Sequence, residues 1–370
     1  MRVLRIDEHS PFRQLVGVGG LGTGMFFALH DNHTLGRNES RLGSLLDVSD
    51  YCKLHIVTHY VAKLLGASQG QFPVVPIGKI GDDAAGAFVM REMRAVGIDT
   101  RFVEVVVGKP TLFSVCFQYP DGSGGNITTG NSAAAELSEQ DIDRAESLFP
   151  SVGPRTIALL VPEVSLTCRE HFLAVARQKG AFSAASFVSG EIADAKRLGM
   201  FDQLNLVSLN EEEAADLVGE AFTPGSPEGF LDMLFRLVAS RYPQLGVVMS
   251  AGKNGAYFID RSGWSHSPSP SVEVASTAGA GDCLLGGILA AMAAGIPLPH
   301  ARRRPAAQSV LEDALDFGVL LASYKVSSPH TIHPDASLGE LLRFAERLGI
   351  SVVSEVERLA SEREIVKTSH

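Results

Sequence analysis

The segment with the clearest chemical potential is STAGAGD at residues 276–282, where small residues lead up to an aspartate. Gly279, Ala280 and Gly281 would leave backbone N–H groups unobstructed at the start of a helix, where the partial positive charge favours an anion such as phosphate. Asp282 would then take a proton from a hydroxyl group while the amides hold the phosphoryl group that the hydroxyl attacks. A plain helix cap with glycines for close packing explains the same residues, and both interpretations stay open.

A second candidate follows a predicted strand over residues 205–209. Asn210 and Glu213 stand one helical turn apart at the carboxyl end of that strand. This placement suits Mg²⁺ held through its water ligands, because Mg²⁺ keeps most of its hydration shell. Asparagine is also a preferred N-cap, and acids in a first turn complement the helix dipole, so an ordinary helix start remains an alternative.

A third candidate is the loop SAGKNGA at residues 250–256, after a predicted strand over 246–249. Ser250, Gly252 and Gly255 would form either an ordinary tight turn or part of a ligand loop. Ligands of open α/β sheets collect beyond the carboxyl ends of strands, and three such loops follow strands in this chain. Together they predict a nucleotide-phosphate site. It is not a P-loop, because asparagine follows the glycine-lysine pair.

A rival signal lies near the start of the chain, where residues 17–22 (GVGGLG) match the G-x-G-x-x-G fingerprint of dinucleotide binding. That fingerprint requires a following helix and an acidic residue about 20 positions later. Glu39 and Asp47 meet the spacing only by count, and residues 30–33 (HDNH) interrupt any long helix. A dinucleotide-dependent oxidoreductase is therefore the weaker alternative.

These candidates need elements that bring them to one edge of the fold, and the chain supplies a regular alternation. Strand-like runs alternate with helical stretches in its second half, the strands at 156–161, 205–209 and 246–250 and the helices near 139–149, 168–179 and 211–218. Earlier, a strand over 74–78 precedes a helix over 84–96. Such alternation predicts a mostly parallel sheet covered on both faces.

A different pattern interrupts the alternation between residues 102 and 129. Apolar and polar residues alternate over 102–107 and 111–119, and a turn at 120–125 leads into a third short run over 126–129. This pattern predicts a small antiparallel sheet inside an otherwise α/β chain.

Composition excludes several classes of protein. Of the 370 residues, 45% are hydrophobic, which is typical of a chain with a large core and not of a fibre or a disordered tail. The net charge of −10 disfavours a nucleic-acid partner. The longest apolar run, 284–298, is shorter than the roughly 18 residues of a spanning helix, so no membrane segment is expected. Four scattered cysteines and an acidic N-terminal segment predict a cytoplasmic protein.

The ordered set of motifs resembles the ribokinase-like (PfkB) family of carbohydrate kinases. Residues 76–86 (PIGKIGDDAAG) are similar to the family's GxxGDDxxG segment, and residues 128–133 (TTGNSA) to its small-residue stretch. The segments 210–213, 250–256 and 277–282 then follow in family order. The resemblance covers about residues 15 to 335.

The resemblance implies a three-layer α/β/α fold with a mostly parallel central sheet, a small β-strand lid, and transfer of the γ-phosphate of ATP, with Mg²⁺, to a hydroxyl of a sugar, sugar derivative or nucleoside. By position it makes Asp282 the general base and the Gly279–Asp282 amides the anion hole. Two groups of residues would meet the nucleotide and its metal: Asn210, Ser250, Gly252 and Gly255 the ATP, and Glu213 with Asn210 the Mg²⁺.

The resemblance also implies a division of the chain. Residues 1–340 would form the kinase domain, with lid strands within about 20–45 and 101–130, and residues 341–370 would be a C-terminal helical extension. A homodimer is expected, because lid strands expose edges that pair between subunits.

Two departures from the family pattern concern the substrate. Members usually carry an aspartate near the first strand that grips substrate hydroxyls, whereas residues 17–25 offer only glycines and Thr23. Members also usually have a Gly-Gly pair with a nearby asparagine, and residues 51–59 (YCKLHIVTH) contain neither. Replacement hydrogen bonds would have to come from other polar residues: Asp31, Asn32, Asn38, Asp47, His55 and His59.

A third departure concerns a cation. Ser276 stands where members usually have an aspartate that, in several relatives, helps to bind a monovalent cation. Loss of this carboxylate removes a full charge, so K⁺ activation is expected to be weak or absent. The eroded substrate motifs also leave open a non-catalytic regulatory protein that binds nucleotide or sugar on a kinase fold.

Overall fold

The computed structural model describes residues 2–121, 124–149, 155–222, 226–300 and 309–360. Its centre is a nine-stranded sheet in the order β13-β12-β11-β10-β9-β8-β1-β4-β5. The strands are β1 (Gln14–Val18), β4 (Val74–Gly81), β5 (Val103–Val106), β8 (Thr156–Leu160), β9 (Phe182–Ser186), β10 (Leu206–Asn210), β11 (Gly246–Ser250), β12 (Ala256–Asp260) and β13 (Gly263–Ser267). Only the pairs β11–β12 and β12–β13 are antiparallel, so the predicted mostly parallel sheet is confirmed.

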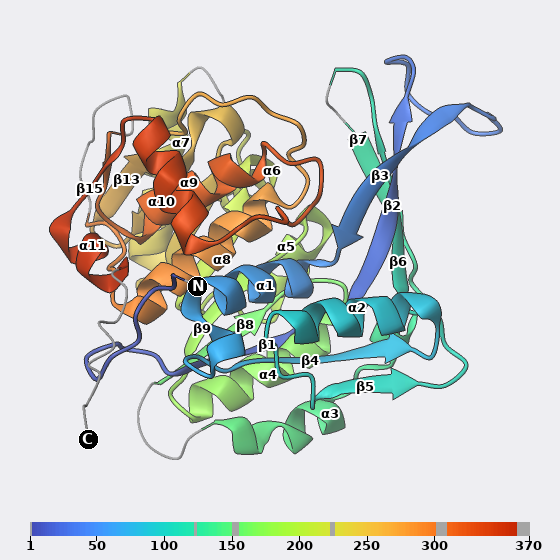
Figure 1. Ribbon diagram of the computed structural model, residues 1–370, viewed down its shortest axis with the longest axis horizontal. Helices are drawn as coiled ribbons and strands as arrows, with labels where there is room; N and C mark the ends of the chain where they lie inside the picture. The colour runs from blue at the N-terminus through green and yellow to red at the C-terminus, as the bar shows by residue number, and fades with distance from the viewer. Residues whose placement is uncertain (1, 122–123, 150–154, 223–225, 301–308, 361–370) are drawn as a thin grey trace, which may run out of the picture.

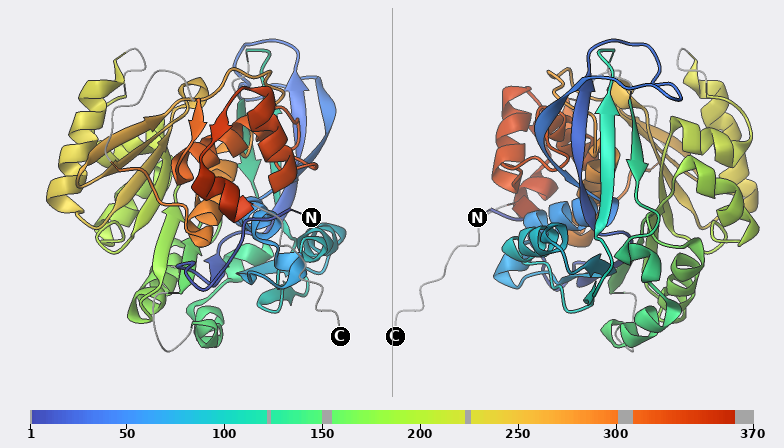
Figure 2. Two further views of the ribbon diagram at one scale, coloured as in Figure 1. Left: turned by 60° about the vertical axis from the view of Figure 1, so that its left-hand side comes forward. Right: turned by 90° about the vertical axis from the view of Figure 1, so that its right-hand side faces the viewer.

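Helices cover both faces of this sheet, which gives three layers (Figures 1 and 2). One face carries α1 (Lys53–Leu65), α2 (Ala84–Ala95), α8 (Ala280–Ala294), α9 (Ala314–Lys325), α10 (Leu338–Arg347) and α11 (Ser354–Ala360). The other carries α3 (Glu139–Arg144), α4 (Leu166–Gln178), α5 (Ile192–Arg197), α6 (Glu211–Val218) and α7 (Pro227–Arg241). Successive side chains of a strand enter different cores: Leu15 of β1 packs on the first face and Val16 on the second.

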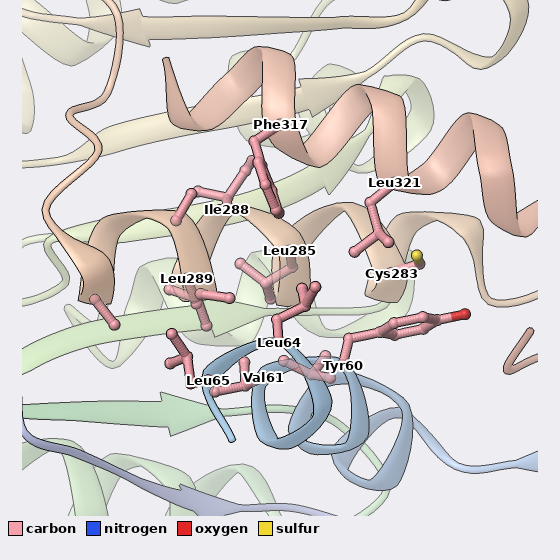
Figure 3. Close-up of a cluster of buried hydrophobic side chains, with 14 of the residues drawn as sticks. Tyr60, Val61, Leu64, Leu65, Cys283, Leu285, Ile288, Leu289, Phe317 and Leu321 are labelled. Atoms are coloured by element: carbon pink, nitrogen blue, oxygen red, sulfur yellow. The ribbon is translucent and has the colours of Figure 1, made fainter. Parts of the chain in front are cut away.

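The apolar run expected to form a buried helix is α8, which lies between α1 and α9 (Figure 3). Glycines let these helices approach closely, because a Cβ atom at Gly287 would lie 3.0 Å from the Cα atom of Gly318 in α9. On the opposite side, Leu285 and Leu289 of α8 share a core with α1. This packing fixes the first turns of α1 and α8 relative to each other.

A second sheet of four strands stands at one side of the molecule (Figure 1). Its order is β3 (Gly43–Tyr51), β2 (Gly22–Leu29), β6 (Leu112–Gln118) and β7 (Gly124–Thr128). The pair β2–β6 is parallel, and the pairs β2–β3 and β6–β7 are antiparallel.

One expectation needs correction. The run 102–107 does not join the small sheet, since β5 pairs in parallel with β4 at the edge of the large sheet. The division of the chain at residue 340 stays a prediction. The proposed boundary falls within α10, and the described helices after it bury apolar side chains such as Leu341 and Leu359 in the same core as α1 and α8.

Parts of two expected segments, residues 122–123 of the hairpin turn and 361–370 of the extension, lie outside the described residues. Among the residues that the structure describes, none of the helices combines the length and the apolar character that a membrane span requires.

Candidate functional site

The site forms where strands of the large sheet end at their carboxyl edge. Asn210 is the last residue of β10 and Ser250 the last of β11, and these parallel strands are in register at that position. The start of α8 comes to the same edge, since Ser250 and Gly281 line one cavity. Open α/β sheets bind ligands at this edge.

A cavity of about 640 Å³, here called the loop pocket, gathers five of the predicted site residues: Ser250, Gly252, Gly255, Ala280 and Gly281. Apolar side chains from α8, α9 and the preceding segment complete its wall: Val272, Val274, Leu284, Val319, Ala322 and Val326. An apolar wall with a few polar groups is typical of a small-molecule site. The predicted residues Gly279, Asp282, Asn210 and Glu213 are not among those that line the pocket.

The start of α8 has the features of an anion site. Gly279 is its N-cap with a left-handed φ of 75°, and no side chain caps the helix. A Cβ atom at Gly279 would lie 2.7 Å from the carbonyl oxygen of Thr331, so the position requires glycine. The N–H of Ala280 donates to the carbonyl of Thr277 at 3.1 Å, so it is engaged within the turn. The N–H groups at Gly281 and Asp282 belong to the first helical turn, where backbone donors lack intrahelical partners.

Asp282 lies beside a lysine that the sequence analysis did not select. The Nζ atom of Lys53, the first residue of α1, is 3.5 Å from Oδ1 of Asp282. The side chain of Asp282 is 10% exposed and that of Lys53 is 31% exposed. The charge of Asp282 raises the pKa of Lys53 well above its usual value, against the effect of burial, so the lysine is an ammonium next to the carboxylate.

A second missed residue is Glu163, which follows β8. Its backbone has a left-handed φ of 75°, and its Oε2 atom has no hydrogen-bond partner among the described residues. Burial raises the pKa of Glu163 to about 7, the charge of Lys53 opposes this, and the charge of Asp282 adds to it. Gly20 makes room, because a Cβ atom there would lie 2.9 Å from Oε2 of Glu163. A strained, buried and partly unpartnered carboxylate is typical of a functional position.

A third missed residue is Asp50 of β3, which lies opposite Gly24 of β2 in the small sheet. A Cβ atom at Gly24 would lie 2.3 Å from Oδ2 of Asp50, so the carboxylate occupies space that a side chain at position 24 would need. Burial raises the pKa of Asp50 to about 6, and the charge of Asp282 adds to this. Asp50, Lys53, Glu163 and Asp282 are called the charged cluster below.

The small sheet presents a polar face and an apolar face. Its ladder puts Gly24, Ser114 and Thr128 on the face that Asp50 shares, and the Sγ atom of Cys116 is 3.8 Å from Oδ2 of Asp50. The charge of Glu163 also raises the pKa of the Cys116 thiol, after burial and Asp50, so this face lies toward the charged cluster.

Asn210 and Glu213 form a capping box at the start of α6. Oδ1 of Asn210 accepts from the N–H of Glu213 and Oε2 of Glu213 accepts from the N–H of Asn210, both at 2.8 Å. Burial raises the pKa of Glu213, Lys53 lowers it and Asp282 raises it. Oδ1 of Asn210 and Oε2 of Glu213 therefore serve as helix caps. Glu213 is nevertheless close enough to Lys53 and Asp282 for their charges to affect its pKa.

The residues considered as substitutes for the missing substrate aspartate do not gather here. Four of them are exposed in and around β3 and the loop before it: Asp31, Asn32, Asn38 and Asp47. His55 and His59 belong to α1, where their rings pack against each other and against Tyr51 and Tyr60. The dinucleotide alternative is wrong, because β1 is followed directly by β2, which starts at Gly22, and no helix begins at residues 17–22.

Comparison with known proteins gives a consistent picture. The family model of the "pfkB family carbohydrate kinase" matches residues 57–337. The chain is 24% identical over 220 residues to a ribokinase of Dictyostelium discoideum, covering 57% of this chain and 68% of that protein.

Two solved structures share the fold. A ribokinase of Cryptococcus neoformans in complex with ADP superposes with a TM-score of 0.71 at 20% identity, covering 90% of this chain and 99% of that one. A structure from E. coli in complex with ATP and Mg²⁺ superposes with a TM-score of 0.68 at 16% identity, covering 91% and 100%. Both structural similarities confirm the three-layer fold.

Proposed function

Because the chain belongs to the pfkB family of carbohydrate kinases, which transfer phosphate to an alcohol acceptor, we propose that it transfers the γ-phosphate of ATP to a hydroxyl of a sugar, sugar derivative or nucleoside, with Asp282 as the general base. The observation that carries the proposal is that the loop pocket and the charged cluster meet at the start of α8. The loop pocket ends at the first turn of α8, and the charged cluster begins at Asp282 in that same turn.

The nucleotide occupies the loop pocket in this proposal. Its base and ribose lie against the apolar wall, and its phosphates reach the loops that contain Ser250, Gly252 and Gly255 and the start of α8. ADP in the related Cryptococcus structure supports a nucleotide on this fold. The N–H groups of Gly281 and Asp282 would donate to the phosphoryl oxygens, over which the charge of the transferred group is spread.

The chemical step is a displacement at phosphorus. A carboxylate oxygen of Asp282 takes the proton of the acceptor hydroxyl, the hydroxyl oxygen forms a bond to the γ-phosphorus, and the bond from that phosphorus to the β–γ bridging oxygen breaks. ADP and a phosphate monoester leave, and the proton passes from Asp282 to solvent. Lys53 orients this carboxylate, because its ammonium lies 3.5 Å from Oδ1 of Asp282 and is itself held charged.

The acceptor lies in the charged cluster. Asp50 is buried and the Oε2 atom of Glu163 is buried without a hydrogen-bond partner among the described residues, so both carboxylates suit hydroxyl groups that donate. Asp50 comes from the small sheet, whose polar face lies toward the cluster. This sheet would act as a lid that excludes water, so that phosphate passes to the alcohol and not to solvent.

Mg²⁺ is the remaining proposed component. When bound with ATP, it neutralises charge on the β- and γ-phosphates. Glu213 fits a role toward this ion through its metal-bound waters, because its Oε2 serves the cap and the second carboxylate oxygen is not used there. Asn210 fits less well, since its Oδ1 accepts from the backbone of Glu213.

A homodimer stays a prediction. The apolar face of the small sheet leaves Leu45 63% exposed and Ile127 71% exposed, and a second copy of the chain would cover them. Sedimentation of the wild type and of Leu45→Glu would test it: a dimer that becomes a monomer supports the prediction, and a wild-type monomer contradicts it.

A cytoplasmic location is part of the same proposal. All four cysteines carry free thiols, and three of them are buried. Free thiols persist in a reducing compartment, which is also where ATP is abundant.

The test is ADP release from ATP and Mg²⁺ with a panel of pentoses, hexoses, sugar acids, sugar phosphates and nucleosides. Turnover with one class of acceptor, lost in Asp282→Asn, supports the proposal and names the acceptor. ATP binding without turnover on any acceptor would favour the regulatory binding protein that the sequence leaves open.

A further inference from the structure

A buried lysine outside the charged cluster has no role in the mechanism described above. Lys325 is the last residue of α9 and is 0% exposed. Its Nζ atom donates to the carbonyl oxygen of Ser276 at 3.0 Å, and it forms no ion pair with a carboxylate of the described residues. Burial lowers the pKa of Lys325 to about 8, opposed by Cys283 and Asp50. Burying an ammonium group without a carboxylate partner costs folding free energy, so a functional role for Lys325 is worth testing.

The position of Lys325 connects it to the anion loop. Ser276 opens the segment that leads to the start of α8, and its hydroxyl accepts from the N–H of Ala278 at 3.3 Å. The N–H groups of Ala275 and Ser276 both donate to the carbonyl of Val326, at 2.7 and 3.2 Å. The end of α9 therefore holds this segment through three bonds, of which only that from Lys325 carries a charge.

The local fields also suit a cation at this point. The ammonium lies at the C-terminal end of α9, where the helix dipole favours positive charge. The carbonyl of Ser276 points its negative end at the ammonium, as a carbonyl ligand would at a metal ion.

A free monovalent cation does not fit the same place. The side chain at position 276 is a hydroxyl and supplies no negative charge, and the main-chain oxygen of that residue already accepts from an ammonium. A K⁺ ion there would lie next to a fixed positive charge, which repels it.

We propose that the ε-ammonium of Lys325 is a built-in cation that holds the 276–281 segment in its anion-binding conformation, so that phosphoryl transfer by this chain needs no monovalent cation. Lys325 is a positioning residue, because it acts on the phosphate through the loop and not by contact. The inference rests on the proposed kinase function and specifies how the anion site of that function is maintained.

The first part of the test uses the wild type alone. ADP formation and ATP affinity are measured in K⁺, Na⁺ and tetramethylammonium chloride at equal ionic strength. We expect rates and dissociation constants that agree within about twofold across the three salts. Activation by K⁺ of about fivefold or more would overturn the proposal, and this result does not depend on the folding of any variant.

The second part removes the charge. Lys325→Met is expected to weaken ATP binding and to lower turnover by about tenfold or more in tetramethylammonium, with partial recovery in K⁺ or NH₄⁺, since a small cation can then enter. A folded variant with unchanged rates, or one that no cation rescues, would contradict the role of the charge.

A matched control is Lys196→Met. The Nζ atom of Lys196 in α5 also donates to a backbone carbonyl at 3.0 Å, that of Leu217 in α6, away from the anion loop. This variant should show no dependence on the cation. ATP affinity separates the failure of the two proposals. A wild type that binds ATP equally in all salts but transfers no phosphate to any acceptor refutes the kinase function, while the role of Lys325 in holding the loop is still tested by the ATP affinity of Lys325→Met.

Discussion

In the proposed mechanism, the loop pocket receives the nucleotide between glycine-containing loops and an apolar wall, whereas the charged cluster would bind the alcohol with side chains from four separate segments. Gly252, Gly255 and Gly281 line the loop pocket and bring no side chain to it. Asp50 comes from the small sheet, Lys53 from α1 and Glu163 from the end of β8. A site made of backbone is tolerant of sequence around it, while a site made of charges changes its ligand when any one segment changes. The residues of the loop pocket and those of the charged cluster therefore differ in how freely they can change.

The largest expected effect comes from the residue where the loop pocket and the charged cluster meet. Asp282→Asn removes the general base and keeps the size of the side chain, so turnover should fall on the order of 10²-fold or more. The dissociation constant of ATP should stay nearly unchanged, because the loop pocket is intact. Steady-state kinetics and calorimetric titration of ATP measure the two quantities. An unchanged rate would mean that the base is misassigned.

Lys53→Met should be the next largest. It leaves the buried carboxylates of Asp282 and Glu163 without their ammonium, so kcat should fall by about tenfold or more while ATP affinity changes little. Lys53→Arg, which keeps the charge, should recover part of the rate. If the arginine variant were as slow as the methionine variant, the charge would not be the property that matters.

Asp50→Asn separates the acceptor from the nucleotide. Loss of a charged acceptor of hydrogen bonds typically costs about 1.5–3 kcal/mol, so the KM of the alcohol should rise by about tenfold or more. The KM of ATP should not change. The reverse pattern, with ATP affected and the alcohol not, would move Asp50 out of the acceptor site.

Gly281→Ala makes the opposite separation with a smaller effect. A Cβ atom at Gly281 meets no heavy atom within 4 Å, so the fold should accept it, but the methyl group enters the loop pocket. We expect the KM of ATP to rise several-fold and the KM of the alcohol to stay constant. A matched variant, Gly279→Ala, should instead lower the melting temperature, because its methyl would meet the carbonyl oxygen of Thr331.

The smallest effect is on stability and depends on pH. The folded chain keeps the proton of Asp50 up to about pH 6, whereas the unfolded chain releases it near pH 3.8. Ionisation of Asp50 therefore costs stability as the pH rises from about 4 to 6, and this cost is fully present at pH 8. Relative to the wild type, Asp50→Asn should gain a few degrees of melting temperature between pH 4 and pH 8.

The control for this prediction is Ser250→Ala in the loop pocket, where no titratable group is changed. Its difference from the wild type should be equal at the two pH values. A pH-dependent difference in the control and none in Asp50→Asn would contradict the assignment of the buried charge.

Much of the fold and one end of the site could be predicted from the sequence. The alternation of apolar runs with helical stretches fixes a mostly parallel sheet, and β10, α6 and β11 lie where the periodicity predicts them. The residues of the glycine loops in the loop pocket could also be predicted, since a glycine loop after a strand is a local signal whose residues are neighbours in the chain.

The charged cluster could not be predicted in this way, because its signals are not local. Asp50 gains its place only when β3 pairs with β2 opposite Gly24, and Glu163 only through a left-handed backbone that glutamate rarely adopts. Lys53 lies in residues 51–59, which lack the family's Gly-Gly pair and asparagine. The one feature that could have marked it as a site residue is its positive charge at the first position of α1. Likewise, the run at 102–107 alternates like a hairpin strand, and its pairing with β4 is decided by the large sheet.

Phosphorus NMR of the reaction with the accepted alcohol, ATP and Mg²⁺ distinguishes phosphate transfer to the alcohol from hydrolysis of ATP. We expect a phosphate monoester of the alcohol in an amount equal to the ADP formed, with little inorganic phosphate. We also expect this signal to disappear in Asp282→Asn while the variant still binds ATP. Inorganic phosphate as the only phosphorylated product besides ADP, or an equal monoester signal in the variant, would contradict the proposed mechanism.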